Sequence, residues 1–237
     1  PVDPSNEKSR NRCNVDFADD VFRYIRAHQP MDLVAITFDV KSFFDTLDHK
    51  VLKRRWRDVI RSGVDLPDDH YNVFKNITKF SYVHENQLFR EFKDRILVER
   101  SPDIIKQKAI TKKKHLLNQR AIAYCHLNEV GYIREANLIK ANKYVNHGSE
   151  LRCKGIPQGS PISAMLANIY MLGFDLAANS FATSLGGIYR RYSDDMIVVC
   201  PVSEEYNVVK FMESRLQGDD CKLEIQEAKT QIFHFIY

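Results

Sequence analysis

Apolar residues recur at helical spacing in three separate stretches of the chain, and each stretch predicts a helix. The first covers residues 16–27 and ends at Gln29-Pro30, because the residue before a proline disfavours helical backbone. The second begins at Asp48 and carries apolar residues at helical spacing as far as Ile60. The third, over 162–179, follows Ser160-Pro161, which is typical of a helix start. It is apolar nearly all round and is therefore predicted to be buried.

Short apolar runs that are rich in β-branched residues predict strands between these helices. Residues 33–40 form such a run and predict a buried strand. Two further runs, 188–192 and 196–200, flank Ser193-Asp194-Asp195 and predict a tight hairpin. Closing strands are expected near residues 223–225 and 232–235. Together these elements predict an α+β fold.

Residues 62–150 follow a different pattern, which predicts a mainly helical insertion. Aromatic and apolar residues recur there in a polar background, and the stretch 106–120 is densely basic. Its centre is the run Lys112, Lys113 and Lys114. Such a run is either the solvated face of a helix or a surface that contacts the phosphates of a nucleic acid. Both interpretations are open at this stage.

Composition narrows the class of protein. Of the 237 residues, 44% are hydrophobic and 28% are charged, which is typical of a globular chain with a core of its own. The formal net charge of +4 permits a polyanionic partner. No run of 18 apolar residues predicts a membrane span, and no glycine-rich nucleotide-binding motif occurs.

The cysteines and the first residues bear on the cellular context. The five cysteines are well separated and form no CxxC pair, so we expect free thiols in a reducing cytoplasm. The chain opens on Pro1-Val2-Asp3-Pro4, without a methionine or a secretory leader. This opening predicts an internal fragment of a longer protein.

Three aspartates lie where strands are predicted to end. Asp39 closes the first buried strand, and Asp194 and Asp195 lie at the tip of the hairpin. Adjacent aspartates are also common turn residues. If the two strands are neighbours in one sheet, however, three carboxylates converge and need a cation, and their hard oxygens select Mg²⁺ or Mn²⁺. Two such ions support nucleotidyl transfer.

Four segments, in this order along the chain, resemble the palm of a reverse transcriptase. They are 38–45 (FDVKSFFD), 155–163 (GIPQGSPIS), 192–195 (YSDD) and the lysine-bearing segment 227–235 (EAKTQIFHF). The FFDTLDH string and the PQGSPIS form fit bacterial enzymes better than retroviral ones. The bacterial types in question are the group II intron-like, retron-like and abortive-infection reverse transcriptases.

The resemblance implies a fold and a catalytic centre. In the palm of this family, an antiparallel sheet packed on helices carries the catalytic aspartates. By resemblance, Asp39, Asp194 and Asp195 are the catalytic residues and bind a pair of Mg²⁺ ions, for which Mn²⁺ can substitute. The backbone carbonyl of Val40 would be a further ligand of these ions.

The resemblance also implies contacts with the substrates. Phe44 falls where the family places the ring that excludes a ribose 2′-hydroxyl. Gln158 and Gly159 would contact the incoming nucleotide, Lys229 the triphosphate or the pyrophosphate, and Tyr192 the primer end. The plainer alternatives are core packing for Phe44 and Tyr192 and a surface position for Lys229.

The resemblance divides the chain into parts. Residues 1–37 would be the remnant of the fingers and the lead-in to the palm, 38–61 and 151–237 the palm itself, and 62–150 the insertion. No fingers motif is recognisable ahead of the palm and no thumb after it. We therefore expect a partner chain or further segments to supply them, and we expect the chain alone to polymerise poorly.

The implied function is RNA-directed DNA polymerisation, in phage defence or in a retroelement. The implied partners are an RNA template, a DNA or RNA primer and deoxynucleoside triphosphates. Two alternatives stay open: templateless or protein-primed DNA synthesis on the same palm, and a maturase-like RNA-binding module with an idle polymerase site. An RNA-dependent RNA polymerase is disfavoured by Phe44.

Overall fold

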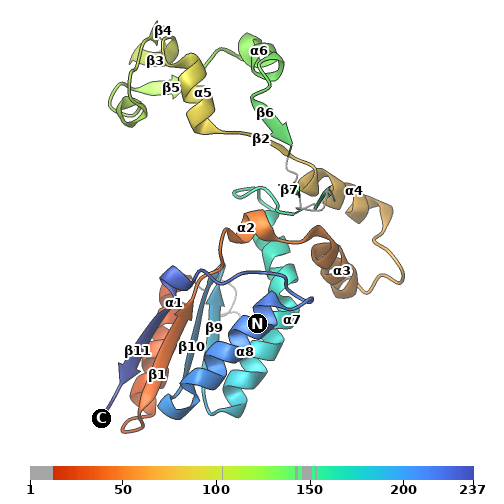
Figure 1. Cartoon of the computed structure of the whole chain (residues 1–237), viewed down its shortest axis with the longest axis vertical. Coiled ribbons are helices and arrows are strands. Elements are labelled where there is room, and N and C mark those ends of the chain that lie inside the picture. The colour runs from red at the N-terminus through yellow and green to blue at the C-terminus, as the bar shows by residue number, and fades with distance from the viewer. Residues whose placement is uncertain (1–12, 103, 142–143, 146–150, 153) are drawn as a thin grey trace. The chain divides into compact units, whose positions relative to one another are not determined.

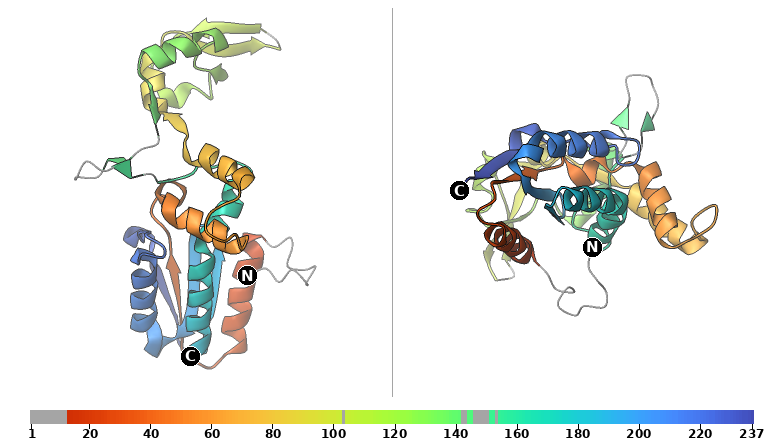
Figure 2. Two further views of the ribbon diagram at one scale, coloured as in Figure 1. Left: turned by 90° about the vertical axis from the view of Figure 1, so that its right-hand side faces the viewer. Right: turned by 90° about the horizontal axis from the view of Figure 1, so that it is seen from below.

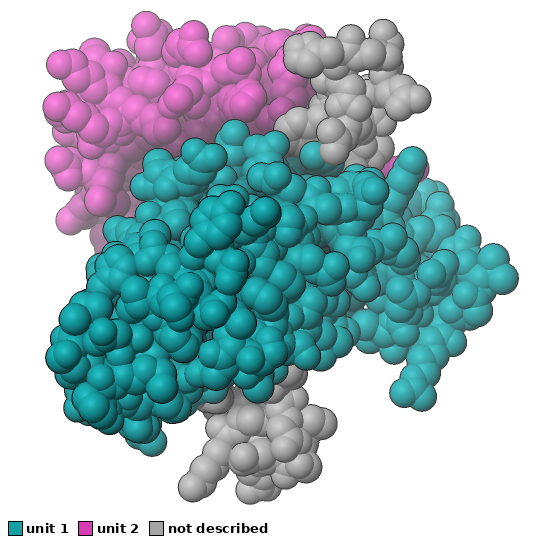
Figure 3. Space-filling view, turned by 60° about the horizontal axis from the view of Figure 1, so that its bottom comes forward, with its two compact units in different colours: residues 1–78, 144–237 teal, residues 79–143 magenta. Residues whose placement is uncertain are grey.

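The computed structural model describes residues 13–102, 104–141, 144–145, 151–152 and 154–237. The chain divides into two compact units (Figure 3). Unit 1 combines residues 1–78 with 144–237, and unit 2 consists of residues 79–143.

A four-stranded antiparallel sheet forms the centre of unit 1 (Figure 1). Its strand order is β11 (Gln231–Phe235), β1 (Leu33–Phe38), β10 (Asp195–Pro201) and β9 (Ile188–Tyr192). The register pairs Leu33 with Pro201 and Phe38 with Met196. The strand that precedes Asp39 and the predicted hairpin are therefore neighbours in one sheet. This is the condition under which the three carboxylates were expected to converge.

Strand β1 is buried on both faces, which explains why its sequence is almost wholly apolar. Successive side chains of a strand point to opposite faces. Val34 and Ile36 accordingly belong to the larger core, whereas Leu33 and Ala35 belong to a smaller one. Strand β1 thus connects two apolar layers and holds the end of the strand, where Asp39 follows, in a fixed position.

Helices cover both faces of this sheet (Figure 2). Helix α1 (Asn14–Ala27) packs Val21 and Ile25 on the smaller core. The larger core lies under α3 (His49–Val59), α7 (Ser163–Ser184) and α8 (Glu205–Gln217). The short helices α2 (Phe43–Thr46) and α4 (Asp68–Thr78) and the two-stranded ladder of β7 (Tyr144–Val145) with β8 (Leu151–Arg152) complete the unit.

Helix α7 departs from its prediction at both ends and on one side. It runs from Ser163 to Ser184 rather than over 162–179. The loop continues through Ser160-Pro161, and the Ser163 hydroxyl donates to the Pro157 carbonyl of this loop (2.5 Å). It is also not buried all round. Its apolar stripe of Met165, Leu172 and Leu176 is exposed, since no described part of the chain covers it.

Unit 2 corrects the prediction of a mainly helical insertion over 62–150. Residues 68–78 form α4 and belong to unit 1, where Ile77 is part of the larger core. Unit 2 itself has the helices α5 (Glu85–Phe92) and α6 (Val130–Glu135) and five strands. The apolar, β-branched start of its central strand favours a sheet over a helix. The strands of unit 2 are β2 (Ser81–Val83), β3 (Ile96–Ser101), β4 (Ile104–Lys108), β5 (Ala121–Ala123) and β6 (Ile139–Ala141).

The confirmed part of the fold prediction is the α+β class with an antiparallel sheet packed on helices. Among the described residues, none of the helices combines the length and the apolar character that crossing a membrane requires.

Candidate active site

The sheet brings the first aspartate beside the hairpin. Asp39 follows the last residue of β1, whose partner in β10 is Met196. Because the two strands are antiparallel, the residue of β10 nearest to Asp39 in this register is Asp195, which precedes Met196 and pairs with Tyr192 to close the hairpin. Ser193 and Asp194 form the two-residue turn, and Ser193 adopts a left-handed backbone with φ 58°. Two-residue hairpin turns commonly need a positive φ at the first central position.

The lysine-bearing segment reaches the same place from another direction. Val40 forms an isolated antiparallel bridge with Ile225, and the Gln226 amide donates to the Asp39 carbonyl at 2.8 Å. A single 3₁₀ turn then places Lys229, whose Nζ lies 3.0 Å from Asp39 Oδ2. The carboxylate of Asp39 is mostly buried and Lys229 is exposed, so the lysine covers it from the solvent side.

An open cavity of about 270 Å³ collects six of the residues singled out from the sequence. These six are Asp39, Val40, Phe44, Gln158, Asp194 and Lys229. Four more residues line the cavity: Ser42, Phe43, Asp45 and Gln226. Gln226 carried no signal in the sequence, because only the bridge between Val40 and Ile225 brings it here.

The remaining candidates do not line the cavity. Gly159 is exposed, whereas the carboxylate of Asp195 lies close enough to those of Asp194 and Asp39 to interact with them electrostatically. Tyr192 is 46% exposed, and its ring lies 6.0 Å from that of Phe17. The lysine run belongs to unit 2, where the ammonium of Lys113 forms an ion pair with Glu85 and donates to Asn86 Oδ1 at 3.0 Å.

Like charges crowd this end of the sheet. Partial burial, followed by the carboxylates of Asp194 and Asp39, raises the pKa of Asp195, and Lys229 opposes the shift. Opposed effects of this kind are expected where several carboxylates share one site with one cation. The ammonium of Lys229 supplies the positive charge that neighbours Asp39.

The residues at this end of the sheet have the types of donor atom that bind a metal pair, but their side chains are not arranged around a metal position. Among the described residues, no three His, Cys, Asp or Glu side chains are grouped so that they could hold a metal ion as they stand. The oxygens of the aspartates and of the Val40 carbonyl are hard donors, which Mg²⁺ prefers. The crowding that raises the pKa of Asp195 would be relieved by a cation. The donor set therefore suits Mg²⁺, and the assignment stays a prediction.

The loop that carries Gln158 docks on the segment that carries Phe44. The Ile156 amide donates to the Phe44 carbonyl and the Gly155 amide to the Leu47 carbonyl, both at 2.8 Å. A Cβ on Gly155 would lie 2.7 Å from the Asp45 carbonyl oxygen, and the backbone there has φ +84°. Only glycine permits this close approach without strain, so Gly155 fixes the distance between the two segments.

A buried histidine reinforces the same contact. His49, the first residue of α3, donates from Nε2 to the Gly155 carbonyl at 2.6 Å. Burial lowers the pKa of His49, although the bond to Gly155 and the charge of Asp48 oppose the shift. No role of this histidine could be predicted from the sequence, because its partner is distant along the chain.

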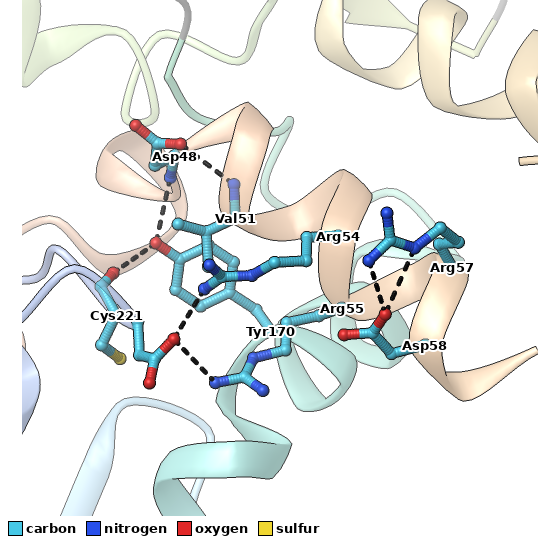
Figure 4. A network of polar contacts seen from close by, with 9 residues as sticks. Asp48, Val51, Arg54, Arg55, Arg57, Asp58, Tyr170 and Cys221 are labelled. Carbon is cyan, nitrogen blue, oxygen red and sulfur yellow. Dashed lines mark hydrogen bonds and ion pairs between the residues drawn. The ribbon is translucent and has the colours of Figure 1, made fainter. Parts of the chain in front are cut away.

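A polar network joins the start of α3 to α7 and to the segment after α8 (Figure 4). The carboxylate of Asp48 caps α3, which begins where the sequence predicted a helix start, and the Asp48 amide donates to the Tyr170 hydroxyl at 3.2 Å. That hydroxyl donates in turn to the Cys221 carbonyl. Arg54 forms an ion pair with Asp220 at 2.8 Å. The network thus ties the segment that leads to Lys229 to the helices under the sheet.

Comparison with known families identifies the class of protein. The family described as "Reverse transcriptase (RNA-dependent DNA polymerase)" matches residues 98–235, which is more than half of the chain. The chain therefore belongs to the reverse transcriptase family. The matched range contains Gln158, Asp194, Asp195 and Lys229, whereas Asp39 precedes it.

Solved structures give a weaker likeness. The telomerase of Candida albicans, in complex with a fragment of telomeric RNA, has 16% sequence identity and a TM-score of 0.48, over 94% of this chain and 31% of its own. The apo telomerase of Candida tropicalis has 18% identity and the same TM-score, over 94% and 33%. The chain thus spans about a third of the length of these proteins. The search of curated proteins finds no match.

Proposed function

We propose that this chain is the palm of an RNA-directed DNA polymerase that adds deoxynucleotides to a primer. The observation that carries the proposal is the convergence of Asp39, Asp194, Gln158 and Lys229 on one cavity from four separate segments. Membership of the reverse transcriptase family supports it. The proposed partners are an RNA template, a DNA or RNA primer and deoxynucleoside triphosphates, with fingers and thumb functions supplied by further segments or by a partner chain.

The proposed roles of Asp39, Val40, Asp194 and Lys229 follow from their position in the cavity, and that of Asp195 follows from its place beside Asp194 in the hairpin. Asp39, Asp194 and Asp195, with the Val40 carbonyl, would hold the Mg²⁺ or Mn²⁺ pair, which would supply activation of the primer 3′-hydroxyl and stabilisation of the departing pyrophosphate. Lys229 releases Asp39 and neutralises the triphosphate, or protonates pyrophosphate as it leaves.

The walls of the cavity select the nucleotide. The ring of Phe44 occupies the space of a ribose 2′-hydroxyl, and Gln158 contacts the incoming nucleotide from the opposite loop. Outside the cavity, Gly159 would permit close backbone approach and Tyr192 would lie toward the primer end; both of these roles rest on the family motifs.

A primer-extension assay tests this proposal. Asp194→Asn removes a charge from the cavity and should abolish extension in Mg²⁺ and in Mn²⁺. Asp219→Asn is the matched control, because Asp219 is exposed and lies outside the cavity. Extension that persists in Asp194→Asn would assign the activity to another site. The assay is run on this chain and on any longer chain that contains it.

The same assay separates the alternatives. Extension that needs an RNA template supports the proposal, and extension without any template identifies a templateless or protein-primed polymerase. RNA binding by a wild-type protein that never extends a primer identifies a maturase-like module. A bacterial lineage, with a role in phage defence or in a retroelement, is also our proposal, and it rests on the FFDTLDH and PQGSPIS strings.

We further propose that unit 2 contacts the phosphates of a nucleic acid. Lys112 and Lys114 are exposed, whereas the ammonium of Lys113 is engaged by Glu85. Removing two phosphate contacts should lower the slope of log affinity against log salt by about 1.5 on single-stranded RNA. Lys112→Ala combined with Lys114→Ala should therefore lower the slope, and Lys113→Ala should leave it nearly unchanged. A wild-type slope in the double variant would leave the run as a solvated surface.

A further inference from the structure

Strand β9 presents two arginines to opposite sides of the sheet. Arg191 points toward α7 and is only 8% exposed, while Arg190 points the other way and forms an ion pair with Asp20 at 3.0 Å. The alternation of a strand explains the difference. Each arginine therefore has its own environment, although the two are neighbours in sequence.

The guanidinium of Arg191 forms a two-point ion pair with Asp175 of α7. Its Nε donates to Asp175 Oδ1 at 2.8 Å and its Nη2 to Oδ2 at 2.6 Å. The Tyr189 hydroxyl donates to the same Oδ1 at 2.8 Å, and Nη2 also donates to Asn168 at 3.1 Å. A planar guanidinium held at two points has a fixed orientation.

The third arm of the guanidinium reaches the hairpin turn. Arg191 Nη1 donates to the Ser193 carbonyl at 2.7 Å. Ser193 is the residue of the turn with left-handed backbone, and its carbonyl belongs to the peptide that joins it to Asp194. The bond therefore fixes the plane of the peptide from which the Asp194 carboxylate extends into the cavity.

We propose that Arg191, oriented by Asp175, is a positioning residue that sets the direction of Asp194. The catalytic part of this inference rests on the proposed function, whereas its structural part does not. Asn168 and Asp175 lie two turns apart on α7, the helix that follows the loop of Gln158. The contacts of Arg191 with Asp175 and with the Ser193 carbonyl form a clamp. This clamp couples the β9–β10 hairpin, which carries Asp194, to α7.

Charge alone does not account for this arrangement. A lysine at position 191 would keep the positive charge beside Asp175, but a single ammonium cannot hold two carboxylate oxygens and a carbonyl in one plane. Arg191→Lys should therefore keep the fold and loosen the turn. Arg190→Lys is the matched control, because Arg190 has no contact with the turn.

Hydrogen exchange, resolved to single amides, tests the structural part. The informative amides are those of Tyr192 and Asp195, the pair that closes the turn. In Arg191→Lys they should exchange faster than in the wild type, while the amides of β1 are unchanged. Equal exchange in Arg191→Lys, Arg190→Lys and the wild type would overturn the clamp. A second variant, Arg191→Gln combined with Asp175→Asn, removes both charges together and so avoids a buried unpaired ion.

Kinetics test the catalytic part, in the form of the protein that extends primers. Misplacing a reacting group by a fraction of an ångström to one ångström costs up to about 100-fold. We expect kcat to fall about 10- to 100-fold in Arg191→Lys, with KM for the deoxynucleotide within about twofold, since the nucleotide loop is untouched. A kcat equal to that of Arg190→Lys would overturn the positioning role. If the wild type extends no primer, the proposed function fails, and hydrogen exchange still decides the clamp.

Discussion

Phe44 is the residue in the cavity whose role is most open to a direct chemical test. Its ring is half-buried and packs on the larger core, yet it also lines the cavity with Asp39 and Gln158. Both interpretations from the sequence, core packing and nucleotide selection, are therefore compatible with its position.

Shortening Phe44 should admit ribonucleotides. In Phe44→Val, the space that the ring occupied becomes free for a 2′-hydroxyl, so the ratio of kcat/KM for deoxy- over ribonucleotides should fall on the order of 10- to 100-fold. Phe44→Tyr keeps the ring and should keep the ratio. The measurement is single-nucleotide extension with each substrate. An unchanged ratio in Phe44→Val would leave the ring as core filler.

His49 gives the fold a dependence on pH. Burial lowers its pKa below the ordinary value of about 6.5, so the folded protein disfavours the charged imidazole. Its contribution to stability is present above pH 6.5 or so and is lost as the pH falls toward the folded-state pKa. In His49→Gln, the free energy of unfolding should therefore change less between pH 7.5 and 5.5 than in the wild type. Urea unfolding at both values measures this difference, and equal changes in both proteins would contradict it.

Single residues could be predicted from the sequence where a short motif carried the information. Asp39, Asp194, Gln158 and Lys229 lie within such motifs, and the structure brings all four to one cavity. Asp175, the partner of Arg191, and Gly155, the partner of His49, could not be predicted as partners. Each of these pairs depends on a contact between segments far apart in sequence, which local pattern does not encode.

At the scale of elements, two glycines in one loop have the same φ angle and different surroundings. Gly155 and Gly159 both have φ +84°, but a Cβ at 155 would meet the Asp45 backbone at 2.7 Å, whereas one at 159 would meet nothing within 4 Å. Substitutions at the two positions can therefore distinguish the energetic cost of the left-handed backbone, which both share, from the cost of a steric clash, which arises only at Gly155.

Alanine at each position should give different losses of stability. Gly159→Ala should cost about 1–2 kcal/mol, the usual cost of left-handed backbone for a residue with a Cβ. Gly155→Ala should cost about 1–3 kcal/mol more, because the loop must move away from α2. Chemical denaturation of both variants measures the difference. Equal losses would mean that the contact between the loop and Asp45 is not tight in solution.

Elements with a strong and simple pattern could be predicted well. Strand β1, the β9–β10 hairpin and the start of α3 follow from apolar runs, turn residues and helical spacing. The strands of unit 2 could not, because the exposed half of β3 and the last three residues of β4 are polar and suit a helix equally well. Pairing with a neighbouring strand decides between the two, and pairing is not local.

At the scale of the whole chain, the two units have separate cores. Every buried residue of the larger and of the smaller core in unit 1 comes from outside residues 79–143. In unit 2, the buried residues Phe89, Ile96, Val98 and Ile110 form a core cluster with partly buried neighbours from the same unit. Stability that resides in separate cores should be lost in separate steps.

Removing unit 2 should consequently leave unit 1 folded. A variant in which a flexible glycine–serine linker joins Thr78 to Tyr144 keeps all of the larger core, including Trp56 of α3, which is 5% exposed. Trp56 is the only tryptophan in the sequence, so its fluorescence reports the unfolding of unit 1 alone. We expect one cooperative thermal transition with a midpoint within about 4 °C of that of the whole chain, a shift that corresponds to about 1 kcal/mol.

The variant should also lose the part of its affinity for RNA that Lys112 and Lys114 supply. A broad, non-cooperative transition would show that unit 1 depends on unit 2 for its fold. A full wild-type affinity for RNA would assign nucleic-acid binding to unit 1 instead.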